Sequence, residues 1–243
     1  KTATVASLGA ALALRGLSVL LIDADAQGNL TSSLGCDATD LAGTYELLMD
    51  RSAAIEDLIV TTSVEGLMLV PGDLRLASAE VELASAEQPN LRLRNKRPVE
   101  GSFDFVFIDT PPSLGFLTIN ALTAADEVLI PVQASYLALG GLVRLEETIE
   151  VVRKRTDTQL PLNGLVVTMF DRRTIHAREV EARLRGHYGD LVYRTVIDRS
   201  VDFDYATTAG EPLLRYAPRS RGSSAYRRLA QEVIERAQKS DTA

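Results

Sequence analysis

Short apolar runs rich in Val, Ile, Leu and Phe alternate along the chain with segments that have the hydrophobic spacing of helices. This alternation constrains the fold most, because strands separated by helices pair in parallel within one sheet. We therefore predict an α/β fold, a mostly parallel twisted sheet with helices on both faces. The expected strands are 18–23, 67–70, 103–108, 127–132, 162–169 and 192–197, and the expected helices are 3–15, 44–49, 74–86, 116–125, 138–155, 176–188 and 222–238.

No linker, internal repeat or low-complexity segment interrupts this pattern, so we expect residues 1–243 to form a single domain. The single cysteine, Cys36, excludes a disulfide framework and an iron–sulfur cluster held by this chain alone. No apolar run approaches the ~20 residues that cross a bilayer. We expect a cytoplasmic protein that does not bind membranes.

The net charge of −7 is distributed unevenly. Between Arg172 and Arg228, 12 arginines stand against 7 acidic residues. Overall acidity argues against a protein that coats nucleic acid, although a local arginine-rich surface can contact a phosphate backbone. From charge alone, solvated helix faces and surface ion pairs are the simpler interpretation. We expect a second basic cluster, between Arg92 and Arg97, to be a solvated loop.

Acidic residues stand at the ends of two expected strands. Asp23 and Asp25 follow the first apolar run, and Asp109 follows a later one. Ligands of such sheets bind beyond the carboxyl ends of the strands, and a buried carboxylate needs a cation partner. Lys1 and Thr2 open the first helix, whose N-terminal N–H groups and dipole favour an anion. Together these residues predict a site for magnesium and phosphate, although each alone could be a turn or capping residue.

Five longer segments, the first two of which contain the acidic residues above, are informative together: LLIDADAQGNLTSSLG (20–35), FDFVFIDTPPSLGFLTINAL (103–122), IPVQASYLALGGL (130–142), VVTMFDRRT (166–174) and RSRGSSAYRRLAQEV (219–233). They resemble the ParA/Soj branch of the ParA–MinD partition ATPases, which are P-loop proteins with a deviant Walker A loop. Lys1 and Thr2 match the last two residues of that loop, K-G-G-x-G-K-[ST]. The resemblance implies a P-loop NTPase fold, and we expect the parent protein to carry the first strand and the glycine-rich loop upstream of Lys1.

The resemblance implies ATP and Mg²⁺ as cofactors and assigns residues to the nucleotide. Lys1 would contact the β- and γ-phosphates, and the backbone N–H groups of Thr2 and Ala3 would also meet phosphate. Met169 and the backbone near Asp198 would flank the adenine. These five positions are the expected nucleotide-binding residues.

The same resemblance implies a catalytic and a metal-binding set. Lys1 and Asp25 would be catalytic, with Asp25 positioning the attacking water. Thr2 would bind Mg²⁺ directly, Asp109 would hold it through water, and Asp23 would support its coordination shell. Phosphoryl transfer to water depends on positioning and charge neutralisation, which these residue types supply.

The implied activity is ATP-dependent DNA partitioning of a chromosome or plasmid. ATP would close a homodimer that binds DNA without sequence preference, at the nucleoid, and a ParB-like centromere-binding protein would stimulate slow hydrolysis. The expected DNA contacts are Arg173, Arg199, Arg219 and Arg221. Asp202 departs from the family, whose relatives place an arginine there, and a carboxylate at that position repels phosphate.

Other activities remain possible from the sequence. A MinD-like ATPase that positions a protein assembly or acts on a membrane would need an amphipathic C-terminal helix, but residues 229–239 carry Glu232 and Glu235 and no aromatic side chain. A degenerate relative without catalysis is a further alternative. The acidic residues retained at 23, 25 and 109 argue against it.

Overall fold

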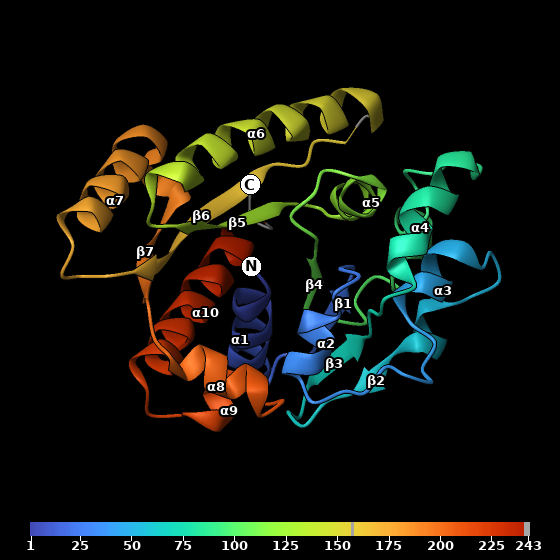
Figure 1. The fold of residues 1–243 in the computed structure, drawn as a ribbon, viewed down its shortest axis with the longest axis horizontal. Coiled ribbons are helices and arrows are strands. Elements are labelled where there is room, and N and C mark those ends of the chain that lie inside the picture. Colours follow the sequence, from blue (N-terminus) through green and yellow to red (C-terminus); the bar gives the residue numbers. More distant parts are fainter. Residues whose placement is uncertain (157, 241–243) are drawn as a thin grey trace.

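The computed structural model describes residues 1–156 and 158–240. Its strands are β1 (Val19–Asp23), β2 (Val60–Thr61), β3 (Leu67–Val70), β4 (Phe105–Asp109), β5 (Val128–Gln133), β6 (Leu162–Phe170) and β7 (Val192–Asp198). They form a four-stranded sheet in the order β2-β3-β1-β4 and a three-stranded sheet in the order β5-β6-β7 (Figure 1). All neighbouring strands run parallel except β2 and β3. The predicted α/β class with mostly parallel strands is confirmed.

Helices cover both faces of the sheets, as predicted. The α-helices are α1 (Thr2–Ala13), α2 (Asn29–Ser33), α3 (Thr44–Met49), α4 (Leu76–Glu82), α5 (Phe116–Ala124), α6 (Tyr136–Thr156), α7 (Ile175–Tyr188), α8 (Asp202–Thr208), α9 (Leu213–Tyr216) and α10 (Arg221–Ser240). Short 3-10 helices η1 to η4 span Ile55–Leu58, Leu83–Ser85, Arg94–Lys96 and Gly189–Leu191.

The central strand β1 shows why both faces are covered. All five of its residues are buried, and successive side chains of a strand point to opposite faces. Val19 and Leu21 join the core that contains α1 and α10. Leu20 and Ile22 join the core that contains α3, α4 and the start of α5. An apolar side chain at every position is therefore what a two-sided strand requires.

The three-stranded sheet is covered in the same way. Val166 of β6 packs into the core of α1 and α10, whereas Leu165 and Val167 pack beneath α6 and α7. Figure 1 shows α6 running across β5 and β6, with α7 beside β7. Among the described residues, no strand pairs with both β4 and β5.

The longer predicted helices and strands are confirmed to within a few residues at each end. The short elements β2, α2, α8 and α9 were not predicted from the sequence. The segment between Arg92 and Arg97 is also more ordered than the solvated loop that we expected. Leu93 within it is buried, and its N–H donates to the Asn120 side chain of α5 at 3.2 Å.

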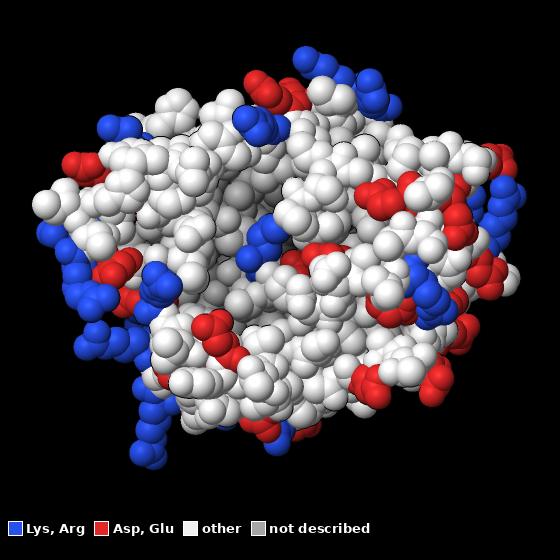
Figure 2. All heavy atoms as spheres, in the orientation of Figure 1, with Lys and Arg blue, Asp and Glu red and all other residues white. Residues whose placement is uncertain are grey.

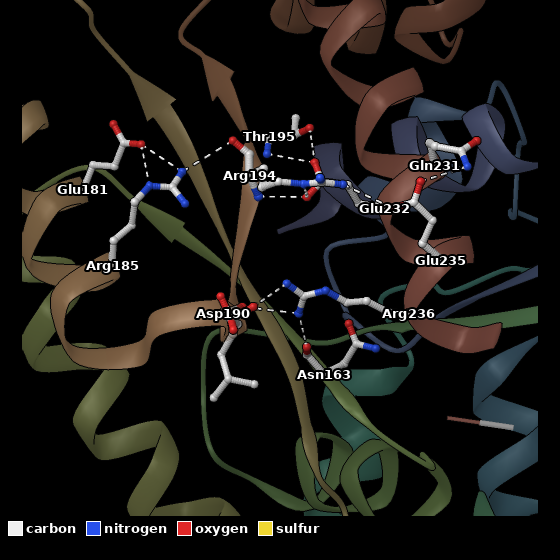
Figure 3. A network of polar contacts seen from close by, with 11 residues as sticks. Asn163, Glu181, Arg185, Asp190, Arg194, Thr195, Gln231, Glu232, Glu235 and Arg236 are labelled. Carbon is white, nitrogen blue, oxygen red and sulfur yellow. Dashed lines mark hydrogen bonds and ion pairs between the residues drawn. The ribbon is translucent and has the colours of Figure 1, made fainter. Parts of the chain in front are cut away.

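The C-terminal helix α10 is fixed to β7 by a buried carboxylate (Figure 3). Glu232 accepts hydrogen bonds from the backbone N–H groups of Arg194 (2.8 Å) and Thr195 (2.9 Å), and from the Thr195 hydroxyl (2.5 Å). Burial alone would raise the pKa of Glu232, but these hydrogen bonds outweigh burial and lower its pKa below the ordinary value. The ionised form of Glu232 therefore stabilises the folded protein.

We expect Glu232→Gln to lower the free energy of unfolding by about 1–3 kcal/mol, because one amide oxygen cannot replace two charged acceptors. The folded-state pKa of Glu232 is lowered, so its contribution is present above the ordinary carboxyl pKa and is lost as the pH falls through the folded value. Urea denaturation of both proteins at pH 7 and in acid measures this. The difference should shrink in acid.

The matched control is Glu235→Gln, which removes a half-exposed carboxylate from the next turn of α10. Glu235→Gln should lower the free energy of unfolding by less than about 1 kcal/mol, because a surface ion pair contributes little to stability. Equal losses for the two variants would contradict the role assigned to Glu232.

Candidate functional site

The carboxyl ends of β1 and β4 place two acidic residues side by side. Asp23 and Asp109 are partners in the parallel register of these strands, and both are almost completely buried. The N-terminal end of α1 lies next to them, since the Lys1 ammonium donates to the carbonyl oxygens of Thr110 (3.1 Å) and Pro111 (2.8 Å). Residues far apart in the sequence thus meet at the sheet edge that the sequence analysis indicated.

The face drawn in Figure 2 is hollowed at its centre, at the place where the N-terminus lies in Figure 1. A basic side chain reaches into the hollow, and acidic side chains border it. The start of α1 is therefore accessible from this face.

Asp109 has an unsatisfied oxygen. Its Oδ2 atom is buried and has no hydrogen-bond partner among the residues that the structure describes. Burial raises the pKa of Asp109, the Thr2 hydroxyl and the charge of Lys1 act in the opposite direction, and Asp25 adds to the increase. A buried carboxylate oxygen without a partner is costly, and a cation bound between Asp109 and Thr2 would remove that cost.

Lys1 lies in the field of the same carboxylates. Burial lowers the pKa of its ammonium group, while Asp109 and Asp25 raise it. The chain thus brings together a lysine, a threonine hydroxyl and carboxylates at the first turn of a helix. The exposed Ala3 belongs to the same turn.

Asp23 has a different environment from Asp109, because protein donors occupy both of its oxygens. Oδ2 accepts from the N–H (2.9 Å) and the hydroxyl (2.7 Å) of Thr31, and Oδ1 accepts from the Asp25 N–H (3.2 Å). Burial raises the pKa of Asp23 to about 6, although the Thr31 hydrogen bonds oppose the increase. Asp23 therefore holds the loop that carries Asp25.

Two residues of this arrangement were not found from the sequence. The Thr31 hydroxyl, besides bonding Asp23, accepts the Gly72 N–H at 3.0 Å. A Cβ atom on Gly72 would lie 2.5 Å from the Asp23 carbonyl oxygen, so only glycine fits there. The only signal for Thr31 was its place in the polar segment after β1, and nothing in the sequence indicated Gly72.

Asp25 is buried and lies in a turn, where its Oδ1 atom accepts the Gln27 N–H at 3.0 Å. Its charge interacts with those of Lys1 and Asp109. The five residues predicted as catalytic or metal-binding, Lys1, Thr2, Asp23, Asp25 and Asp109, thus share one region.

The predicted adenine-side residues lie in the second sheet. Met169 and Asp198 stand at the carboxyl ends of the neighbouring strands β6 and β7. Met169 is half-exposed and has φ of 52°, a left-handed conformation that is uncommon outside glycine and is often found at functional sites. The Asp198 carboxylate pairs with Arg172 at 2.9 Å, which leaves its backbone as the group available for a base.

The arginines predicted to contact DNA do not share one environment. All four, Arg173, Arg199, Arg219 and Arg221, are exposed, but Arg173 also forms an ion pair with Asp171 at 3.0 Å. Figure 2 shows basic side chains along the edge where α7 and the loops around α8 and α9 lie in Figure 1. Asp202 opens α8, and its carboxylate accepts the Ser200 hydroxyl at 2.9 Å.

The donor set fits magnesium. No group of three or more His, Cys, Asp or Glu side chains that could hold a metal occurs in the part of the chain that the structure describes. Mg²⁺ does not need such a cage, because it keeps several waters and binds through one or two carboxylates together with substrate phosphates. A hydroxyl from Thr2 and the free oxygen of Asp109 match that requirement.

None of the described helices combines the length and the apolar character needed to cross a membrane.

Comparisons with known proteins agree with this geometry. The profile of the family described as "AAA domain" matches residues 1–162. The chromosome-partitioning ATPase Soj of Thermus thermophilus is 46% identical over 238 residues, which cover 98% of this chain and 92% of that protein. The sporulation initiation inhibitor protein Soj of Bacillus subtilis is 44% identical, over 96% of this chain and 92% of that protein.

A solved structure shows the same fold. It is described as cobyrinic acid a,c-diamide synthase from Mycobacterium smegmatis with bound ADP and magnesium. It superimposes with a TM-score of 0.83 at 36% identity, over 98% of this chain and 89% of that one. The Soj and ParA relatives match this chain at 43–46% identity over 90% or more of their own length. This chain therefore belongs to the ParA/Soj family of P-loop partitioning ATPases.

Proposed function

We propose that this protein is a DNA-partitioning ATPase that acts at the nucleoid in the cytoplasm, with residues 1–243 as one ATPase domain. In the proposed cycle, ATP and Mg²⁺ close a homodimer, the dimer binds DNA without sequence preference, and a ParB-like partner stimulates slow hydrolysis. The observation that carries the proposal is the buried pair Asp23 and Asp109 beside the first turn of α1, where Lys1 and Thr2 stand. Relatives named as chromosome-partitioning proteins support it.

Each residue of the site has a task in this proposal. The Lys1 ammonium and the first-turn N–H groups of Thr2 and Ala3 would bind the phosphates, which a helix N-terminus favours. Thr2 and Asp109 would hold Mg²⁺, which neutralises phosphate charge when bound. Asp23 keeps its hydrogen bonds to Thr31 and so positions the loop that carries Asp25.

Asp25 is the candidate for orienting the attacking water. It lies in a turn that Asp23 and Gln27 fix, near both Lys1 and Asp109. A carboxylate held there could accept a hydrogen bond from water without entering the metal's coordination shell.

Asp109→Asn tests the metal site. We expect the apo variant to be as stable as the wild type or more stable, because the substitution removes a buried charge. It should lose the stabilisation by Mg²⁺ and ATP, which is about 2.7 kcal/mol at a ligand concentration of 100 times Kd. Thermal unfolding of the full-length protein, with and without Mg²⁺ and ATP, measures both effects.

The control for that experiment is Asp104→Asn. Asp104 lies just before β4, at its opposite end, where its carboxylate accepts the Ser18 N–H at 2.7 Å. Asp104→Asn should retain the ligand-dependent stabilisation. If Asp109→Asn also retains it, Asp109 does not hold the metal.

Asp25→Ala tests catalysis separately from binding. We expect ATP hydrolysis to fall about 100-fold or more, the usual contribution of a group that activates a nucleophile, with ATP affinity unchanged. Steady-state hydrolysis and equilibrium binding by calorimetry on the full-length protein separate the two. Asp40→Ala, which removes an exposed carboxylate, should change neither. Normal turnover by Asp25→Ala would contradict the assignment.

Asp202→Arg tests the DNA surface, because the change replaces repulsion of phosphate with attraction. We expect tighter binding to nonspecific duplex DNA, with the slope of log K against log salt steeper by about one per added phosphate contact. Fluorescence anisotropy over a salt series measures both. Asp57→Arg, which makes the same charge change in η1, is the control. Equal effects of the two variants would mean that only net charge matters.

A further inference from the structure

A pocket of about 560 Å³ lies away from the nucleotide site, between the residues that follow α3 and those that follow α4. Its walls come from residues 51–56 on one side and 87–99 on the other. This volume falls in the range of ~300–1,000 Å³ that small-molecule sites occupy. None of the residues assigned to ATP, magnesium or DNA lines it.

Four basic side chains line the pocket, but two of them already have carboxylate partners. Arg51 pairs with Glu87, and Arg97 pairs with Asp126 at 2.8 Å. Arg92 and Lys96 line the same pocket.

Arg92 and Lys96 are close enough to influence each other. The Lys96 ammonium donates to the backbone carbonyl of Asp50. Burial lowers the pKa of Lys96, the Asp50 carboxylate opposes this, and the charge of Arg92 lowers it further. Two like charges held together in a concave surface are stabilised by an anion between them.

Arg92 also has an unsatisfied donor. Its Nε atom is buried, and in the described part of the chain no acceptor bonds to it. A buried N–H without a partner costs free energy, which a rotation of the Arg92 side chain that brings this N–H onto a ligand oxygen in the pocket would recover. The planar guanidinium group is suited to phosphate, which can accept two parallel N–H donors.

The rest of the lining indicates an organic ligand rather than a bare ion. Ala53, Ala54 and Val99 supply apolar surface beside the basic groups. The exposed carboxylate of Glu56 would repel a second phosphate on its side but could accept a hydroxyl. The lining therefore has one region for a phosphate and another for a mostly apolar body.

Hydrogen bonds to α5 hold one wall of the pocket in place. The Asn120 side chain donates to the Pro89 carbonyl (2.7 Å) and accepts the Leu93 N–H (3.2 Å). The Thr123 hydroxyl donates to the Asn90 carbonyl at 2.6 Å. A wall fixed in this way loses little conformational entropy when a ligand binds.

We propose that this pocket binds a small organic phosphate, with the phosphate on Arg92 and Lys96 and the organic body against Ala53, Ala54 and Val99. The site is independent of the nucleotide site and does not require the proposed ATPase function. A ligand bound there also stabilises the segment 87–97 against α5.

Phenyl phosphate is the probe, with inorganic phosphate as its comparison. Titration of the ¹⁵N-labelled full chain, followed by NMR, reads the Arg92 Nε–Hε signal and the backbone amides of 92–97 directly. Binding near Lys1 therefore does not obscure the result. We expect saturable shifts at these signals, tighter binding of phenyl phosphate than of inorganic phosphate, and slower hydrogen exchange of the Leu93 amide.

Arg92→Gln and Lys96→Gln should each weaken phenyl phosphate binding about tenfold or more, as loss of a charge-assisted hydrogen bond predicts. Arg94→Gln is the matched control, since Arg94 is exposed in the same 3-10 helix and does not line the pocket. Lys1→Ala should leave the shifts unchanged. In the Arg92 variant the amides of 93–97 report binding.

Three results would overturn the proposal. One is the absence of saturable shifts at 92–97. Another is an equal loss of affinity in Arg94→Gln and Arg92→Gln, which would indicate attraction to the loop's net charge. The third is equal affinity for phenyl phosphate and inorganic phosphate, which would mean that the apolar wall takes no part. If Arg92→Gln fails to fold, the same comparison between Lys96→Gln and Arg94→Gln decides the outcome.

Discussion

The site depends on the burial of two carboxylates at adjacent positions of a parallel sheet. Asp23 and Asp109 stand opposite each other at the ends of β1 and β4, and each raises the free energy of ionising the other. Such a pair is stable only if donors or cations compensate both groups. The chain compensates Asp23 from within, through Thr31 and Asp25, and leaves one oxygen of Asp109 without a protein donor.

The two carboxylates therefore differ in what they can bind. Asp23, fully bonded, fixes the backbone that leads to Asp25 and closes it against Gly72 through Thr31. One oxygen of Asp109, Oδ2, can still accept a bond from a bound ligand or cation, and the Thr2 hydroxyl lies beside this carboxylate. The unsatisfied oxygen lowers the stability of the folded protein, and binding of a cation would restore that stability.

The sequence was sufficient for features with a strong local signal. The apolar runs predicted the long strands, and the polar residues directly after them predicted the carboxylates that the sheet brings together. The sequence could not give the network around Glu232, because its donors on β7 are backbone N–H groups that carry no side-chain signal. The pocket beside Arg92 was missed because it depends on Asn120 and Thr123 of α5, which lie far away in the sequence.

Under the proposed function, the distribution of charge would separate the DNA-binding surface from the nucleotide site. Around the predicted DNA face, Arg172 and Arg173 are tied to Asp198 and Asp171, so their charges are partly neutralised before any phosphate approaches. A phosphate would have to displace a carboxylate there, which reduces the net gain. Among the described residues, no carboxylate pairs with Arg221 at the start of α10, so a phosphate there would displace none. Under the proposed function, attraction to DNA would therefore centre on that helix, while Asp23, Asp25 and Asp109 would repel nucleic acid from the proposed nucleotide site.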